Sequence, residues 1–127
     1  MCMNDSQPTV LFVDDEKSAL NSICRFLRRE PYRMLFAESG ADALNILSSE
    51  CVDVLITDLR MPEMSGIELL EVVSERFPHI LLLVVSATTE KQEMDDVLKK
   101  ITVFEFVFKP INPQEFKESL RKALLSV

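Results

Sequence analysis

The stretch Val10-Leu-Phe-Val-Asp-Asp15 decides how this chain folds, because a short apolar run ends directly in two acids. Two later stretches repeat the design. Val54-Leu-Ile-Thr-Asp58 also ends in an acid, and Phe106-Val-Phe-Lys-Pro110 ends in an amine followed by proline. Apolar runs without polar alternation are typical of strands covered on both faces of a parallel sheet. Because open α/β sheets bind ligands at the carboxyl ends of their strands, the charged ends predict a single acidic, cation-binding pocket.

Five apolar runs alternate along the chain with segments of helical period, in which apolar residues recur three and four positions apart. The runs are Val10–Val13, Met34–Ala37, Val54–Thr57, Ile80–Val85 and Val103–Phe108. Strands and helices that alternate in this way imply right-handed crossovers and a parallel sheet. We therefore expect an α/β fold made of a single doubly wound (βα)5 domain over residues 1–127, with its core at about residues 9–125.

Local signals agree with this register. Ser65-Gly-Ile-Glu68 has the form of a helix-capping box, and Asn112-Pro-Gln-Glu115 places a cap, a proline and an acid at a helix start. In the last apolar run, alternation on a buried strand is expected to cover at least two of Phe104, Phe106 and Phe108.

The composition restricts the kinds of partner. With 14 basic and 21 acidic side chains in 127 residues, the net charge is −7, which disfavours binding to nucleic acid or to an anionic membrane surface. Cys2, Cys24 and Cys51 are odd in number and lack metal-ligand spacing, so they are expected to be reduced. The N-terminus has no signal sequence, and no apolar run is long enough to span a bilayer, which favours a cytoplasmic location. Whether the chain is a complete protein or the first module of a longer one stays open.

The charged strand ends indicate phosphoryl chemistry. Asp14, Asp15 and Asp58 would concentrate negative charge, and Mg²⁺ suits such a site because it needs few carboxylates and is often completed by phosphate oxygens. Lys109 would hold an anionic group beside the metal. Asp58 precedes a loop that would leave its carboxylate accessible, so it is the candidate nucleophile that forms an acyl phosphate. Ser86 ends the fourth run, where its hydroxyl is a candidate donor to a phosphoryl oxygen, with the amide of Ala87 as another.

Together these motifs resemble the receiver domain of two-component response regulators. The resemblance is carried by five motifs in order: Asp14-Asp15, Asp58-x-x-Met61-Pro62, Gly66, Ser86-Ala87 and Lys109-Pro110. Several separated motifs in the right order are far more specific than any one of them. The resemblance covers nearly the whole chain and implies a flavodoxin-like sheet with strand order 2-1-3-4-5.

The resemblance also assigns roles to individual residues. It implies that Asp58 is the phosphoacceptor, that Mg²⁺ is bound directly by Asp15, Asp58 and the main-chain carbonyl of Arg60, and that Asp14 acts mainly through water. It implies that Lys109 pairs first with the acceptor carboxylate and then with the phosphoryl group, and that the Lys109–Pro110 peptide is a candidate for the cis form.

The resemblance further implies a switch. Phe106 takes the place of the aromatic residue that packs inward when the Ser86 hydroxyl moves toward the phosphoryl group, which would alter the surface of the fourth helix, fifth strand and fifth helix. The chain departs from the family before that residue, where Val103 and Phe104 replace the usual small pair. Arg60 and Thr88 lie at the pocket mouth, and we hypothesise that Arg60 shields the acyl phosphate from water.

The implied partners are a sensor histidine kinase or phosphotransfer protein as donor, and a C-terminal output domain or a separate effector as target. Dimerisation on activation stays open. On this reading the chain is a signalling phosphoacceptor, not an enzyme, whose only reactions are its own phosphorylation and dephosphorylation.

Three alternatives remain. A magnesium-dependent aspartyl phosphohydrolase usually has its nucleophile at the end of the first strand and a second acid two residues later, whereas Asp14 and Asp15 are adjacent. A flavin or nucleotide carrier would need a glycine-rich phosphate loop, which does not follow the first run. A degenerate receiver that only docks is disfavoured because the acids, the hydroxyl and the lysine are all present.

Overall fold

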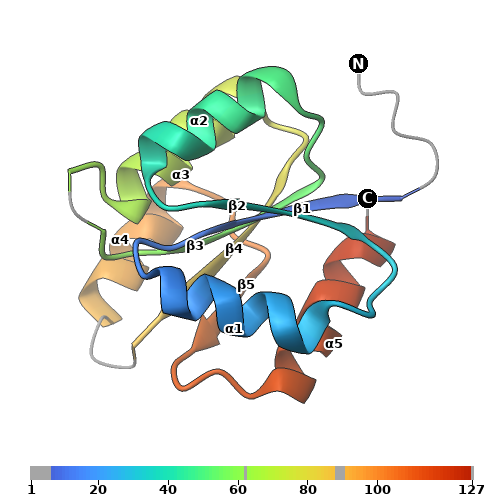
Figure 1. Cartoon of the computed structure of the whole chain (residues 1–127). Coiled ribbons are helices and arrows are strands. Elements are labelled where there is room, and N and C mark those ends of the chain that lie inside the picture. The colour runs from blue at the N-terminus through green and yellow to red at the C-terminus, as the bar shows by residue number, and fades with distance from the viewer. Residues whose placement is uncertain (1–6, 62, 88–90, 127) are drawn as a thin grey trace.

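The computed structural model describes residues 7–61, 63–87 and 91–126, in which strands and helices alternate from β1 to α5 (Figure 1). The strands are β1 (Thr9–Val13), β2 (Arg33–Ala37), β3 (Val54–Asp58), β4 (Leu81–Ser86) and β5 (Glu105–Phe108). The helices are α1 (Lys17–Leu27), α2 (Gly40–Ser49), α3 (Gly66–Arg76), α4 (Lys91–Lys100) and α5 (Pro113–Leu125). The predicted alternation is confirmed.

The five strands form one parallel sheet in the order β2-β1-β3-β4-β5. This confirms the flavodoxin-like order expected from the resemblance. The chain crosses from one side of the sheet to the other after β2, so β1 and β3 are neighbours although a strand and two helices separate them in sequence. Ligands of such sheets bind at this point, beyond the carboxyl ends of β1 and β3.

Two apolar cores lie on opposite faces of the sheet, because side chains alternate along each strand. Leu11 and Val13 of β1 face the core under α2, α3 and α4, whereas Val10 and Phe12 face the core under α1 and α5. Figure 1 shows α1 and α5 on one side of the sheet and α2 and α3 on the other. Every residue of β1 and β3 is buried, as expected for strands covered on both faces.

Both predicted helix starts are present. The Ser65 hydroxyl accepts a hydrogen bond of 3.2 Å from the Glu68 amide at the start of α3. At the start of α5, the Asn112 side chain accepts from the amides of Gln114 and Glu115, with Pro113 in the first turn. These caps satisfy amide groups that have no partner within the helix.

The last strand differs from the prediction. β5 begins at Glu105, not at Val103, and Phe104 and Phe108 are 36% and 44% exposed. The expectation that at least two of the three phenylalanines are buried was therefore wrong. The reason is that β5 is an edge strand, so the helices leave part of it uncovered; Phe106 is half-buried against the core under α4. No helix in the described part of the chain is long and apolar enough to cross a bilayer.

Candidate functional site

Asp14 and Asp58 become neighbours through the register of β1 and β3. Val13 pairs with Thr57, so each acid lies one residue beyond this last pair, at the carboxyl edge of the sheet. Asp14 continues the alternation of Phe12, and Asp58 continues that of Ile56, so both point to the face that α1 covers. Both residues are buried, with 8% and 6% of their surface exposed.

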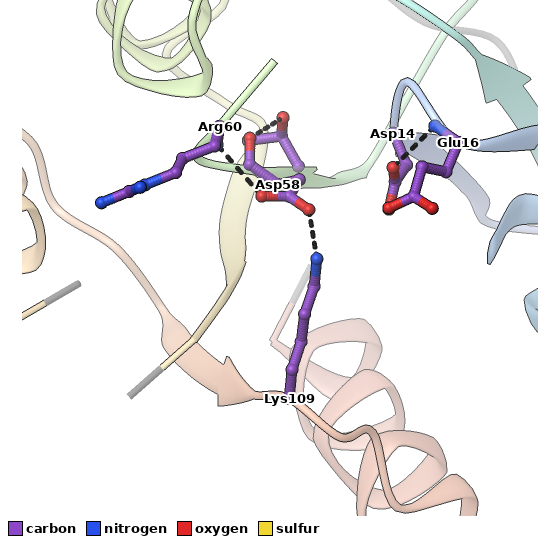
Figure 2. Close-up of polar contacts among 6 residues, drawn as sticks. Asp14, Glu16, Asp58, Arg60 and Lys109 are labelled. Carbon is purple, nitrogen blue, oxygen red and sulfur yellow. Dashed lines mark hydrogen bonds and ion pairs between the residues drawn. The ribbon is translucent and has the colours of Figure 1, made fainter. Parts of the chain in front are cut away.

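Lys109 lies beside Asp58, although 51 residues separate them in sequence. Its amine is 2.5 Å from Asp58 Oδ2 and forms an ion pair with it, while the Arg60 amide donates to Asp58 Oδ1 at 3.0 Å. Figure 2 shows the lysine reaching from the end of β5 to this carboxylate. The Lys109–Pro110 peptide bond is cis, as the resemblance implies.

The electrostatics of Asp14 show that the site is crowded with negative charge. Burial raises the pKa of the Asp14 carboxyl above its usual value, and the charges of Asp58 and Asp15 raise it further. A hydrogen bond of 2.9 Å from the Glu16 amide and the charge of Lys109 act in the opposite direction. A cation at this edge would relieve the repulsion between the carboxylates.

The charge of Lys109 is stabilised by the acids around it. Burial lowers the pKa of its amine, but the hydrogen bond and charge of Asp58, with the charges of Asp14 and Glu16, outweigh burial, so the net shift is upward. The lysine therefore remains a cation at neutral pH, ready to pair with an anionic group.

Ser86 and Phe106 lie on adjacent strands and on the same face of the sheet. Phe106 pairs with Val84 in register, and Ser86 lies two residues beyond Val84, so both side chains face α4. Ser86 is fully buried, and its hydroxyl donates to Met94 Sδ of α4 at 3.4 Å. In this structure the hydroxyl is thus engaged with α4.

The backbone and the side chain of Arg60 contact different elements. Its amide donates to Asp58, but its guanidinium forms an ion pair with Glu93 of α4, with Nη2 and Oε1 2.5 Å apart. Figure 2 shows the side chain running away from the Asp58 carboxylate. The Arg60 side chain is 65% exposed and that of Glu93 32% exposed, so the pair lies near the surface, and neither residue lines the cavity that Asp14, Asp58 and Lys109 border.

The structure brings together three of the predicted site residues, Asp14, Asp58 and Lys109, with the amide of Arg60. Asp15 is exposed. Pro62 and Thr88, which the sequence analysis singled out, lie outside the described residues. Among the residues described, no three His, Cys, Asp or Glu side chains are close enough together to form a ready-made metal cluster. Mg²⁺ does not need one, since it is usually held by one or two carboxylates, water and phosphate.

Sequence reasoning missed the contributions of α4 and the Glu16 amide. Neither Met94 nor Glu93 was assigned to the site, because contacts across 8 and 33 residues leave no local signal. Neither Asp14 nor Asp15 is the N-cap residue of the first helix. Glu16 is the N-cap residue of α1 and its side chain makes no capping hydrogen bond.

A cavity of about 330 Å³ opens beside the site, between α1 and the segment that follows β5. Its walls are mostly apolar, from residues such as Phe12, Ile23 and Ile56, and its polar end is formed by Asp14, Asp58 and Lys109. The Asp58 carboxylate is therefore reachable from solvent although it is mostly buried.

The sequence of this chain is similar to those of known proteins. The sequence profile of the response regulator receiver domain matches residues 10–121. The hydrogenase transcriptional regulatory protein HoxA of Cupriavidus necator is 33% identical over 122 residues, which cover 96% of this chain and 25% of that protein. The transcriptional regulatory protein GlrR of Escherichia coli is 30% identical over 122 residues, or 96% of this chain and 27% of that protein. The chain thus spans about a quarter of the length of these relatives.

Solved structures agree with the sequence comparison. The signal receiver domain of an HD domain-containing protein from Pseudomonas fluorescens superposes with a TM-score of 0.91 and 26% identity, over 94% of this chain and 96% of that one. A CheY-like response regulator receiver domain protein from Methanospirillum hungatei gives a TM-score of 0.88 at 25% identity, over 95% and 96% of the two chains. The chain belongs to the receiver domain family of two-component response regulators.

Proposed function

We propose that this chain is a phosphoacceptor domain in which Asp58 accepts a phosphoryl group from a histidine kinase, a phosphotransfer protein or a small acyl phosphate. The observation that carries the proposal is the 2.5 Å pair between Lys109 and the buried Asp58 carboxylate at the end of the central strand. An aspartate there is held in one orientation, faces a cavity, and has a cation ready for the incoming charge.

The transfer exchanges one bond for another. An oxygen of the Asp58 carboxylate attacks phosphorus, the bond from phosphorus to the donor nitrogen or oxygen breaks, and the donor leaves with the electron pair of that bond. Lys109 then exchanges part of its contact with the carboxylate for a phosphoryl oxygen. Because its pKa is raised, the amine keeps its proton throughout and acts by charge alone.

We further propose that Asp15, Asp58 and the Arg60 carbonyl hold Mg²⁺, with Asp14 acting mainly through water. The site's chemistry fits this ion, because the donors are hard oxygens and the Asp14 carboxylate is destabilised by burial and by its acidic neighbours. When bound, Mg²⁺ would supply the positive charge that phosphoryl oxygens need.

The output is proposed to be a change of conformation, not turnover. The Ser86 hydroxyl would leave Met94 for a phosphoryl oxygen, and Phe106, on the same face, would move with it. Both residues lie against α4, so the surface of α4, β5 and α5 would change and be read by an output domain or a separate effector. We propose that residues 1–127 form this one domain. We also propose that the protein is located in the cytoplasm.

The proposal is tested by incubating the protein with Mg²⁺ and a small acyl phosphate and recording its intact mass. We expect a gain of one phosphoryl group in the wild type and none in Asp58→Asn. Asp42→Asn, which changes an exposed aspartate in the first turn of α2, is the matched control and should gain the group normally.

Two results would contradict the proposal. A mass gain in Asp58→Asn would move the acceptor to another residue. Consumption of many equivalents of acyl phosphate at a rate typical of an enzyme would instead support the phosphohydrolase alternative, because a receiver turns over only as fast as its acyl phosphate decays.

A further inference from the structure

Arg60, in the loop after β3, contacts Asp58 through its backbone amide and Glu93 of α4 through its side chain. Arg60 lies two residues after Asp58 in the sequence, and its amide donates a hydrogen bond of 3.0 Å to the Asp58 carboxylate. Its guanidinium is nonetheless turned outward onto Glu93, at 2.5 Å. The cation is therefore kept from the carboxylate by an acid on a different element.

The pair can open at little energetic cost. The arginine side chain is 65% exposed and the glutamate side chain 32% exposed, and exposed ion pairs contribute only about 1 kcal/mol or less. A phosphoryl group on Asp58 would carry close to two negative charges and three acceptor oxygens, within the length of one arginine side chain. It would compete with Glu93 for the same guanidinium.

We propose that Glu93 is a positioning residue that sets the lifetime of the acyl phosphate by withholding Arg60 from it. This inference rests on the proposed function of Asp58. While Glu93 holds the guanidinium, the phosphoryl group stays open to water. When the guanidinium swings inward, it covers the phosphoryl oxygens and excludes the attacking water.

The reaction controlled in this way is hydrolysis. Water attacks phosphorus, the bond between phosphorus and the Asp58 oxygen breaks, and the products are the free carboxylate and inorganic phosphate, with the proton of the water passing to phosphate or solvent. Neither Glu93 nor Arg60 donates or accepts a proton in this step. Their effect is on access and on the stability of the phosphorylated state.

The test measures the decay of the phosphorylated mass after removal of excess acyl phosphate, in the wild type, Glu93→Gln, Arg60→Ala and the double variant. Glu93→Gln should lengthen the lifetime by about two- to fivefold, the range expected from the strength of an exposed ion pair. In the Arg60→Ala background the same substitution should have no effect, because the cation that it releases is absent.

Asp95→Asn is the matched control, because Asp95 is an exposed acid of α4 that makes no hydrogen bond or ion pair within the described ranges; it should decay like the wild type. A lifetime unchanged or shortened by Glu93→Gln overturns the proposal, as does a lengthening that persists without Arg60. Failure of the wild type to gain a phosphoryl group is a different result, which would overturn the proposed function itself.

Discussion

Gly66 packs directly against the main chain of Asp58. A Cβ atom added to Gly66 would lie 2.1 Å from the Asp58 carbonyl oxygen and 2.7 Å from the Leu59 Cα, both of them backbone atoms. The Gly66 amide also donates to the Leu59 carbonyl at 2.9 Å. The start of α3 is thus packed against the end of β3, and this contact fixes the main chain from which the Asp58 carboxylate extends.

Replacing Gly66 should therefore disturb the site as well as the fold. We expect Gly66→Ala to lower the free energy of unfolding by about 1–3 kcal/mol, the usual range for overpacking, because the added methyl group meets main chain that cannot move aside. It should also slow phosphorylation of Asp58 by shifting its carboxylate. Denaturant unfolding and the rate of mass gain measure the two effects.

Gly40→Ala is the control, since both glycines are the first residue of a helix and follow a serine N-cap, so the change in helix propensity is shared. The three atoms nearest to a Cβ at Gly40 all belong to the side chain of Met64, and the closest, Sδ at 2.6 Å, is at its flexible end and can turn away. If the two variants lose equal stability, the contact with Asp58 is not what makes Gly66 necessary.

The ionised Asp14 carboxylate is expected to destabilise the folded state, and bound Mg²⁺ is expected to stabilise it. Because the pKa of Asp14 is raised in the folded state, its contribution to stability is fully present below its unfolded pKa and is lost as pH rises through the folded pKa. At neutral pH without metal, Asp14→Asn should therefore raise the melting temperature. The advantage should shrink as the pH approaches the unfolded pKa of 3.8.

With Mg²⁺ present, the wild type should instead be more stable than Asp14→Asn. A ligand at one hundred times its dissociation constant stabilises the folded state by about 2.7 kcal/mol, and the variant should lose part of this gain because one carboxylate is missing. Thermal melts with and without Mg²⁺, at matched ionic strength, measure both effects. Equal stabilisation of the wild type and the variant by Mg²⁺ would place the metal away from Asp14.

The Ser86 hydroxyl should respond to loss of its sulfur partner. Met94→Leu keeps the volume of the side chain, so stability should change by less than about 1.5 kcal/mol, but Ser86 loses its acceptor. A thioether sulfur is a weak acceptor, so the bond should lie at the low end of the net range for hydrogen bonds, about 0.5 kcal/mol, and we expect phosphorylation by a small acyl phosphate to become about twofold faster. Met34→Leu, at another half-buried methionine, should leave the rate unchanged. An equal rate in Met94→Leu would mean that the contact does not restrain Ser86.

The sequence was sufficient for the sheet and for the acids at its edge, because both depend on local patterns. Apolar runs ending in Asp14, Asp58 and Lys109 determine strand positions, and the parallel order then brings the three together. Contacts made by α4 were not predictable, since the ion pair of Arg60 with Glu93 depends on how a helix lies over a loop. The exposure of β5 was also missed, because a strand at the edge of a sheet can have the same apolar composition as a central one.

Tyr32 belongs to the core under α1 and α5, and it offers a test of that core that is independent of the site. The ring is 5% exposed, and its hydroxyl is buried without a hydrogen-bond partner among the residues that the structure describes. Removing an unsatisfied buried hydroxyl avoids its desolvation penalty, so Tyr32→Phe should stabilise the protein by about 1 kcal/mol at neutral pH. Denaturant unfolding measures the change. A loss of stability on substitution would show that the hydroxyl has a partner.

The same group should make the wild type sensitive to alkali. Burial raises the pKa of the Tyr32 phenol well above its usual value, and the charge of Glu30 raises it further, against an opposing effect of Arg121. The folded state thus holds the proton more tightly than the unfolded state. The stability linked to this proton is therefore intact below the unfolded pKa of about 10 and is lost as pH rises through the folded pKa.

Because the chain has one tyrosine and no tryptophan, tyrosinate absorbance reports this ring alone. We expect ionisation to coincide with unfolding, and the Tyr32→Phe variant to keep its stability to higher pH; ionisation of the folded protein near pH 10 would show that the hydroxyl is open to solvent.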